Sequence, residues 1–144
     1  MEDQSAPALE ILTRLYEVQQ DTAIRYSRLL TQYQDLEGDI RAVFSRIVEE
    51  SSACTLELKT FLEHTNPGVV FPHPGNAQKI GTVQSTAKKE MLFASLADIE
   101  SLQNAYSIAL SWKGTERIAG KFPVNHLEKI KLLYDHIRLL YEAQ

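Results

Sequence analysis

Residues 46–62 read RIVEESSACTLELKTFL and indicate the fold class, because their apolar residues recur at alternating steps of three and four. That spacing is typical of one face of an α-helix. The stripe extends beyond the quoted stretch, and its members are Leu36, Ile40, Val43, Ile47, Glu50, Cys54, Glu57 and Phe61. Two carboxylates, Glu50 and Glu57, therefore share an otherwise apolar face. We expect a helix over 36–65, begun by Asp35 as its cap and ended by Pro67 and Gly68.

Three further segments carry the same periodicity. We predict helices over 8–33, 82–112 and 125–143, with Pro7 near the start of the first. Between 67 and 81 the chain holds three prolines and three glycines, which regular structure does not tolerate. A connection of this length usually crosses a bundle or covers one end of it. The prediction is one all-α domain over residues 1–144, a four-helix bundle with a long Pro/Gly-rich crossover between its second and third helices.

The composition excludes several classes of function. The chain has 144 residues, of which 44% are hydrophobic and 24% charged, as is usual for a globular domain. A net charge of −4 argues against nucleic acid or an anionic membrane as partner. The single cysteine allows no intrachain disulfide, and the acidic N-terminus has no signal-peptide pattern. No stretch approaches the ~18 apolar residues of a membrane span. We expect a cytoplasmic protein.

Two of the predicted helices resemble a known family. The stretch 46–62 and the stretch 127–140, LEKIKLLYDHIRLL, are similar to short bacterial ferritin-like proteins of unknown function. The first helix fits more loosely, as does 105–110 in the third. The resemblance implies a ferritin-like antiparallel four-helix bundle with one crossover, and it brings no assigned activity. Tyr134 stands where many members of that family are expected to carry histidine.

A di-metal site in such bundles normally uses two Glu-x-x-His pairs on inward faces. No glutamate of this chain has a histidine three residues downstream. We therefore expect a non-catalytic binding or structural module, without a complete di-iron site, catalytic residues or a cofactor. The alternative is an iron- or manganese-binding protein or oxidoreductase with an atypical carboxylate-rich site. Its candidate ligands are Glu17, Asp21, Glu50, Glu57, Glu100 and His136.

The tyrosines lead to a hypothesis about the interior. All six lie on predicted inward stripes: Tyr16, Tyr26, Tyr33, Tyr106, Tyr134 and Tyr141. A buried tyrosine hydroxyl needs a hydrogen-bond partner. The natural acceptors are Gln19, Asp21, Glu50, Glu57 and Gln103. We hypothesise that a network of tyrosines and carboxylates fills the space of a di-metal centre.

The last two predictions concern where the histidines lie and whether the first helix packs against a partner. Each of the four histidines is expected at the surface or near a helix end, with His126 directly after the cap Asn125. A phosphotransfer module would need His126 or His136 exposed in mid-helix. Leu15, Val18 and Leu29 lie off the main stripe of the first helix. A second apolar strip suggests burial by a partner, so we predict a homodimer through a helix face.

Overall fold

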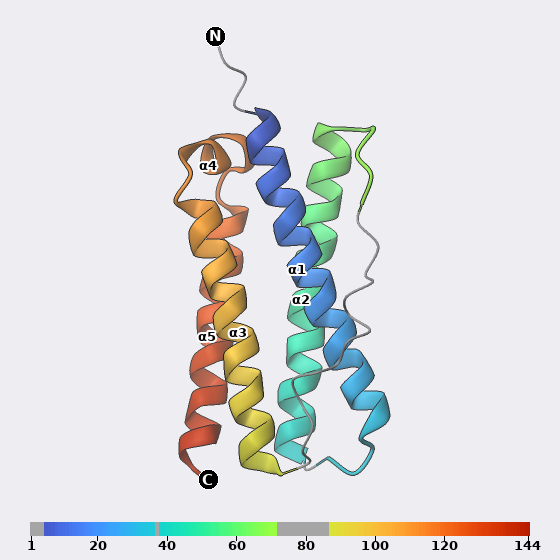
Figure 1. Ribbon diagram of the computed structural model, residues 1–144, viewed down its shortest axis with the longest axis vertical. Coiled ribbons are helices and arrows are strands. Elements are labelled where there is room, and N and C mark those ends of the chain that lie inside the picture. Colours follow the sequence, from blue (N-terminus) through green and yellow to red (C-terminus); the bar gives the residue numbers. More distant parts are fainter. Residues whose placement is uncertain (1–4, 37, 72–86) are drawn as a thin grey trace.

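The protein folds into helices only, over the part of the chain that its computed structural model describes, residues 5–36, 38–71 and 87–144. The helices are α1 (Ser5–Gln32), α2 (Gly38–Thr65), α3 (Lys88–Leu110), α4 (Lys113–Ala119) and α5 (Phe122–Glu142) (Figure 1). The described residues contain no strand, and the all-α prediction is confirmed. Within these ranges no helix combines the length and the apolar character that crossing a membrane requires.

The four long helices lie side by side, and the short α4 sits at the end of the molecule where α1 begins (Figure 1). α1 packs mainly against α2, and α3 packs mainly against α5. The two helices of each pair run in opposite directions. α2 ends at one end of the molecule, whereas α3 begins at the other. The core therefore lies between two antiparallel helix pairs.

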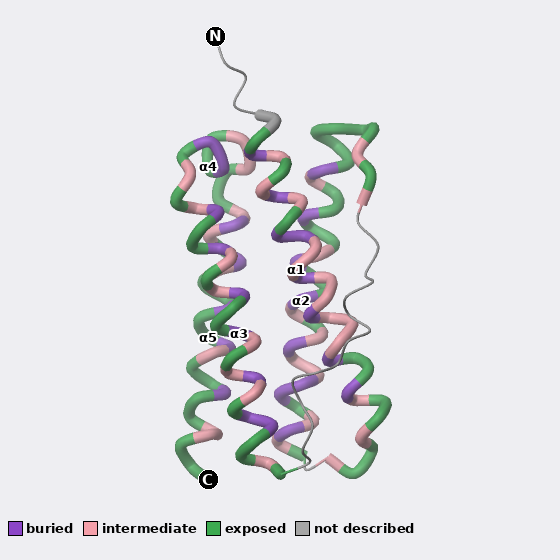
Figure 2. The backbone as a smooth tube through the Cα atoms, viewed as in Figure 1, coloured by how far each residue is buried: buried purple, intermediate pink, exposed green. Residues whose placement is uncertain are grey.

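Each long helix buries one stripe of its surface, as the buried positions in Figure 2 show. In α2 these positions are Ile40, Val43, Phe44, Ile47, Ser51, Cys54, Leu58 and Leu62. The expected stripe agrees at Ile40, Val43, Ile47 and Cys54, but the core continues through Leu58 and not through Glu57. Glu50 and Glu57 thus stand at the edge of the core. The side of α2 that carries Leu58 is buried more deeply than the side that carries Glu50 and Glu57. This rotation lowers the cost of removing the two carboxylates from water.

The chain between α3 and α5 differs from the expectation. The sequence predicted a loop over 113–124 and a last helix beginning at Asn125, and both are wrong. This stretch holds the helical turns of α4, and α5 already begins at Phe122. Pro123 occupies the first turn of α5, where its missing N–H leaves no intrahelical bond unmade. His126 therefore lies inside α5 and not at its tip.

The turn between α4 and α5 depends on a glycine. Gly120 follows the last residue of α4 with φ of 76°, a conformation that side chains with a Cβ rarely adopt. Its N–H donates to the carbonyl of Glu116 and closes the helix end. Lys121 then precedes α5. The early start of α5 thus follows from a glycine and a proline three residues apart.

Other predicted boundaries hold to within a few residues. α1 spans 5–32 where 8–33 was expected, and α2 ends at Thr65 as predicted. α2 begins at Gly38, so Asp35 lies too far upstream to be its cap. α3 ends at Leu110, two residues before the expected Trp112. The expected start of α3 at 82 and most of the crossover lie outside the described residues.

The apolar strip that suggested a partner on the first helix has another explanation. Leu15 and Leu29 are each only 2% exposed and belong to the core of the chain itself. α1 contacts α2, α3 and α4, and a helix with three neighbours needs a wide apolar face. Leu15 and Leu29 therefore give no support for a partner, and the homodimer stays a prediction. Only Val18 of the three is partly exposed, and it packs against the core from outside.

Candidate functional site

One polar side chain from each long helix joins a line of hydrogen bonds that runs from the interior to the surface. The four are Gln19 of α1, Glu57 of α2, Tyr106 of α3 and His126 of α5. Gln19 Nε2 lies 2.9 Å from the hydroxyl oxygen of Tyr106, which lies 2.8 Å from His126 Nδ1. His126 Nε2 is hydrogen-bonded to Glu57 Oε1. We call these four residues the hydrogen-bond line. It joins all four long helices.

The direction of every bond in the line follows from its ends. The Glu57 carboxylate can only accept, so His126 Nε2 carries the proton of that bond. Burial lowers the pKa of His126 and favours the neutral ring, so Nδ1 accepts from the Tyr106 hydroxyl, whose oxygen accepts from Gln19 Nε2. The line therefore holds His126 in one neutral tautomer. Such coupled bonds stabilise one arrangement of the helices that carry them.

Burial sets the electrostatics of the line. Gln19 and His126 are each 1% exposed and Tyr106 is 0% exposed, whereas the side chain of Glu57 is 54% exposed. Burial lowers the pKa of His126 below its usual 6.5, and this outweighs the opposing effect of Glu57. Burial likewise raises the pKa of Tyr106 well above 10. The line thus runs from a neutral interior to a carboxylate that reaches water.

His126 is the residue of the line that the sequence analysis placed wrongly. The expectation was a surface or capping position, but His126 is buried in the second turn of α5. The buried positions of α5 are Pro123, His126, Ile130, Leu133 and Ile137, again at steps of three and four. Leu127, Tyr134 and Tyr141, assigned to the inward stripe, are only partly buried. Extending the spacing of Ile130, Leu133 and Ile137 by one more step towards the N-terminus would have predicted that His126 faces the core.

The lowered pKa of His126 predicts a pH dependence of stability. Between that lowered pKa and 6.5 the unfolded chain binds more protons than the folded chain, so the free energy of unfolding falls as pH falls through this interval. The contribution is fully present above 6.5, is lost below it, and levels off below the folded-state pKa. One proton gives a slope of at most about 1.4 kcal/mol per pH unit.

Urea unfolding between about pH 7.5 and about pH 5 measures this slope. His126→Gln removes the titrating group and keeps an amide that can hydrogen-bond. We expect the wild type to lose more stability than this variant over the interval. An equal loss in both proteins would show that His126 does not titrate as its burial requires.

A second polar cluster lies between α1 and α3. The Tyr26 hydroxyl donates to Asp98 Oδ2 at 2.5 Å, and Arg25 Nη1 lies 3.4 Å from Asp98 Oδ1. The side chain of Asp98 is only 10% exposed, so these bonds compensate for its loss of water. Burial raises the pKa of Tyr26 well above 10, and the neighbouring Asp98 adds to this effect. Asp98 was not among the expected partners, because it lies at the edge of its helix stripe.

The six candidate metal ligands lie at different places. Glu57 is bonded to His126, and Glu50 pairs with Arg46 at 3.3 Å. The exposed His136 also contacts Arg46, at 3.1 Å. The other three are Glu100, exposed on α3, the partly buried Glu17, and Asp21 beside Arg25 and Asp98. The described ranges hold no group of three or more His, Cys, Asp or Glu side chains placed to share a metal ion.

Two of these carboxylates have unusual surroundings. Burial raises the pKa of Asp21; Glu17 adds to the shift, and Arg25 opposes it. Glu50 Oε2 is buried and has no hydrogen-bond partner among the described residues. The same is true of Gln19 Oε1, at the inner end of the hydrogen-bond line. A buried polar atom without a partner is uncommon and costs stability.

The tyrosine hypothesis describes part of this interior. Tyr106 bonds directly to Gln19, but as the acceptor and not as the expected donor, and it reaches Glu57 only through His126. Tyr26 uses Asp98, and the buried Tyr16 accepts a bond from Gln20. The remaining three tyrosines are only partly buried: Tyr33, Tyr134 and Tyr141. Tyrosines thus occupy two interior polar clusters, one of which includes a histidine that the hypothesis lacked.

Cys54 lies one turn before Glu57 on α2 and is 4% exposed. Burial raises the pKa of its thiol to about 12, so it is protonated at neutral pH. This agrees with the interpretation of Cys54 as a small apolar core residue.

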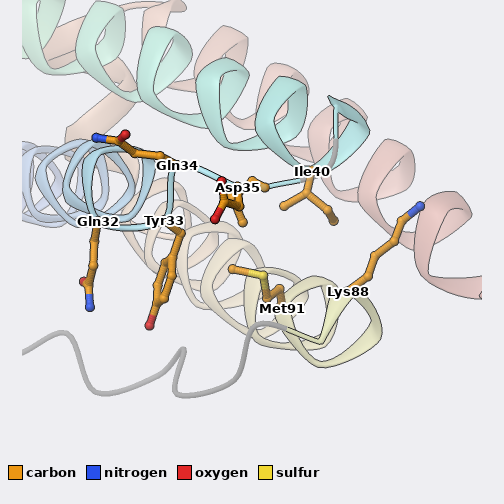
Figure 3. Close-up of a pocket in the computed structure, with 8 residues that line it drawn as sticks. Gln32, Tyr33, Gln34, Asp35, Ile40, Lys88 and Met91 are labelled. Atoms are coloured by element: carbon orange, nitrogen blue, oxygen red, sulfur yellow. The ribbon is translucent and has the colours of Figure 1, made fainter.

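A hollow of about 390 Å³ lies at the connection between α1 and α2 (Figure 3). Tyr33, Ile40, Lys88 and Met91 are among the residues around it. The Lys88 ammonium points away from Asp35 in Figure 3 and pairs with Asp39 at 2.5 Å. The cation at this hollow is therefore already used to join α3 to the start of α2.

Searches of protein-family models, of curated proteins and of solved structures found no match to this chain. The class of protein is therefore defined by its own fold and interior. It is an all-α protein in which four long helices are joined by a Gln–Tyr–His–Glu line whose first three members are buried. The resemblance to ferritin-like proteins stays a prediction.

Proposed function

We propose that the protein is a ferritin-like four-helix bundle that serves as a non-catalytic binding or structural module. The opposite positions of the end of α2 and the start of α3 support the crossover of such a bundle. The pairing of α1 with α2 and of α3 with α5 supports it as well. The same proposal places the protein in the cytoplasm, as a homodimer that binds no nucleic acid.

The hydrogen-bond line is the observation that carries this proposal. A di-metal centre takes about four carboxylates and two imidazoles from the four helices. Here the four helices contribute an amide, a phenol, an imidazole and one carboxylate, and each is hydrogen-bonded to the next. Of the potential metal-binding atoms in the line, His126 Nδ1 accepts from Tyr106 and Nε2 is protonated. This donor set suits a structural role better than a pair of redox metals.

Metal analysis of the purified native protein tests the proposal. We expect well below one equivalent of iron or manganese per chain, whereas a di-metal bundle holds about two. The matched variant is His126→Gln, which we expect to have the same metal content as the wild type. About two equivalents in the wild type would overturn the proposal, and their loss in His126→Gln would place them at the hydrogen-bond line.

One observation favours the second candidate, an iron- or manganese-binding protein or oxidoreductase with an atypical carboxylate site. Glu50 Oε2 is buried without a hydrogen-bond partner among the described residues, two turns of α2 from Glu57. An unpartnered carboxylate oxygen is a suitable ligand for a hard cation. The metal analysis decides here too, with Glu50→Gln as the variant that should lose the metal if this candidate is correct.

A further inference from the structure

An apolar groove of about 460 Å³ runs between α1 and α3. Leu15 and Ala109 are buried in it, while Ile11, Val18 and Ala105 are partly exposed. Ile108 also lines the groove and is 72% exposed, among the most exposed large apolar side chains of the described residues. One face of the molecule therefore carries both an apolar hollow and an apolar projection. We call this surface the α1/α3 face.

The same face carries two opposite charges one helical turn apart. Glu10 and Arg14 lie four residues apart on α1, line the groove, and are exposed. The described residues offer neither of them an ion-pair partner. An unpaired acid and an unpaired base beside an apolar groove are complementary to a surface with the reverse order of charges. A second copy of α1 in the antiparallel direction has that order.

The position of these charges fits a two-fold axis through the middle of the groove. The α1 residues that line it run from Pro7 to Val18, so its centre falls between residues 12 and 13. The point midway between Glu10 and Arg14 is residue 12. An axis at residue 12, close to this centre, therefore places Glu10 of one copy opposite Arg14 of the other, twice, and brings the two grooves nearly face to face.

We infer that the α1/α3 face is the contact between two copies of this chain, packed about a two-fold axis across α1. Ile108 of each copy enters the groove of the other, and the Glu10–Arg14 pairs set the register. A two-fold contact uses the same patch on both copies, and this patch contains a projection, a hollow and both charges. The inference deepens the homodimer of the proposed function and names its surface.

Light scattering coupled to size-exclusion chromatography tests the inference on the full chain. We expect the wild type at twice the chain mass of 16.3 kDa. Glu10→Arg and Arg14→Glu each create two like-charge contacts, and each should raise the dimer dissociation constant at least ~10-fold. The double variant E10R/R14E restores opposite charges across the axis, and its dissociation constant should return to within about threefold of the wild type.

Two more variants separate apolar packing from charge. Ile108→Asp should dissociate the dimer, whereas Leu132→Asp, at a 63% exposed leucine on α5, should not. Helical circular dichroism of each variant confirms that it is folded. A monomeric wild type would overturn the homodimer altogether. A wild-type dimer that Glu10→Arg and Ile108→Asp leave intact would overturn only the assignment to the α1/α3 face. Dissociation without rescue by E10R/R14E would overturn the antiparallel register.

Discussion

Replacing His126 with alanine is expected to lower the free energy of unfolding by about 3–5 kcal/mol. His126 is 1% exposed, and its two ring nitrogens make two of the three contacts of the hydrogen-bond line. Its ring also meets those of Tyr106 and Phe122 edge-on, with centroids 5.7 and 5.3 Å apart. The substitution leaves a cavity and a buried Tyr106 hydroxyl without its acceptor. The cavity and the unpaired hydroxyl both lie in the interior, where each lowers the free energy of unfolding most.

The control for this prediction is His64→Ala. His64 is exposed in the last turn of α2, where it offsets the negative helix end, and its removal should cost about 0.5 kcal/mol or less. The loss of unfolding free energy for Tyr106→Phe should fall between these two values, at about 1–2 kcal/mol, because the substitution removes one hydroxyl and leaves the ring packing unchanged. Urea unfolding at about pH 7.5 measures all three. A loss below about 1 kcal/mol for His126→Ala would mean that the line contributes little to stability.

The second large effect is expected at Phe44, which is 0% exposed in the core between α1 and α2. Phe44→Ala should lower the free energy of unfolding by about 3–5 kcal/mol. The ring lies edge-on to Tyr26, with centroids 5.0 Å apart at 77°, and Tyr26 in turn holds Asp98. The cavity therefore opens beside a buried carboxylate and loosens its hydrogen-bond partner.

The same substitution at an exposed phenylalanine is the matched control. Phe93 is 62% exposed on α3, and its ring lies 6.0 Å from that of Tyr141. Phe93→Ala should change the free energy of unfolding by less than about 1 kcal/mol. Thermal and urea unfolding followed by circular dichroism give both values. Similar losses for the two variants would contradict the core described for α1 and α2.

The predicted helices and the observed ones agree because long helices leave a strong pattern. Periodicity alone placed α1 and α2 to within three residues at each end. It failed between α3 and α5, where Gly120 and Pro123 build a short helix and an early helix start. Turn chemistry of this kind involves single residues, so a count of apolar positions overlooks it. The misplaced start of α5 then put His126 at a helix end.

The candidate site was harder to predict than the fold. Gln19, Tyr106 and Glu57 were named from the sequence as possible members of one network, whereas His126 and Asp98 were not. A helix turns by about 100° per residue, so a rotation of half that angle moves a polar residue from the rim into the core. Neighbouring helices decide that rotation, because each buries the face that packs best. Glu57 was misplaced in this way: it was predicted to face inward, and its side chain is 54% exposed. His126 was predicted at the surface because the start of α5 was misplaced, and it is buried.

The amino-acid sequence by itself determined that this chain is helical, where α1 and α2 lie to within three residues, and that it carries no Glu-x-x-His pair. These are local properties, set by spacing and composition over one or two turns. Only the tertiary structure decided which polar residues meet. Gln19 and Tyr106 are 87 residues apart in the chain, and Glu57 and His126 are 69 apart. Their contact depends on how four helices pack, because a hydrogen bond needs its atoms within about 3 Å, far finer than any periodicity specifies.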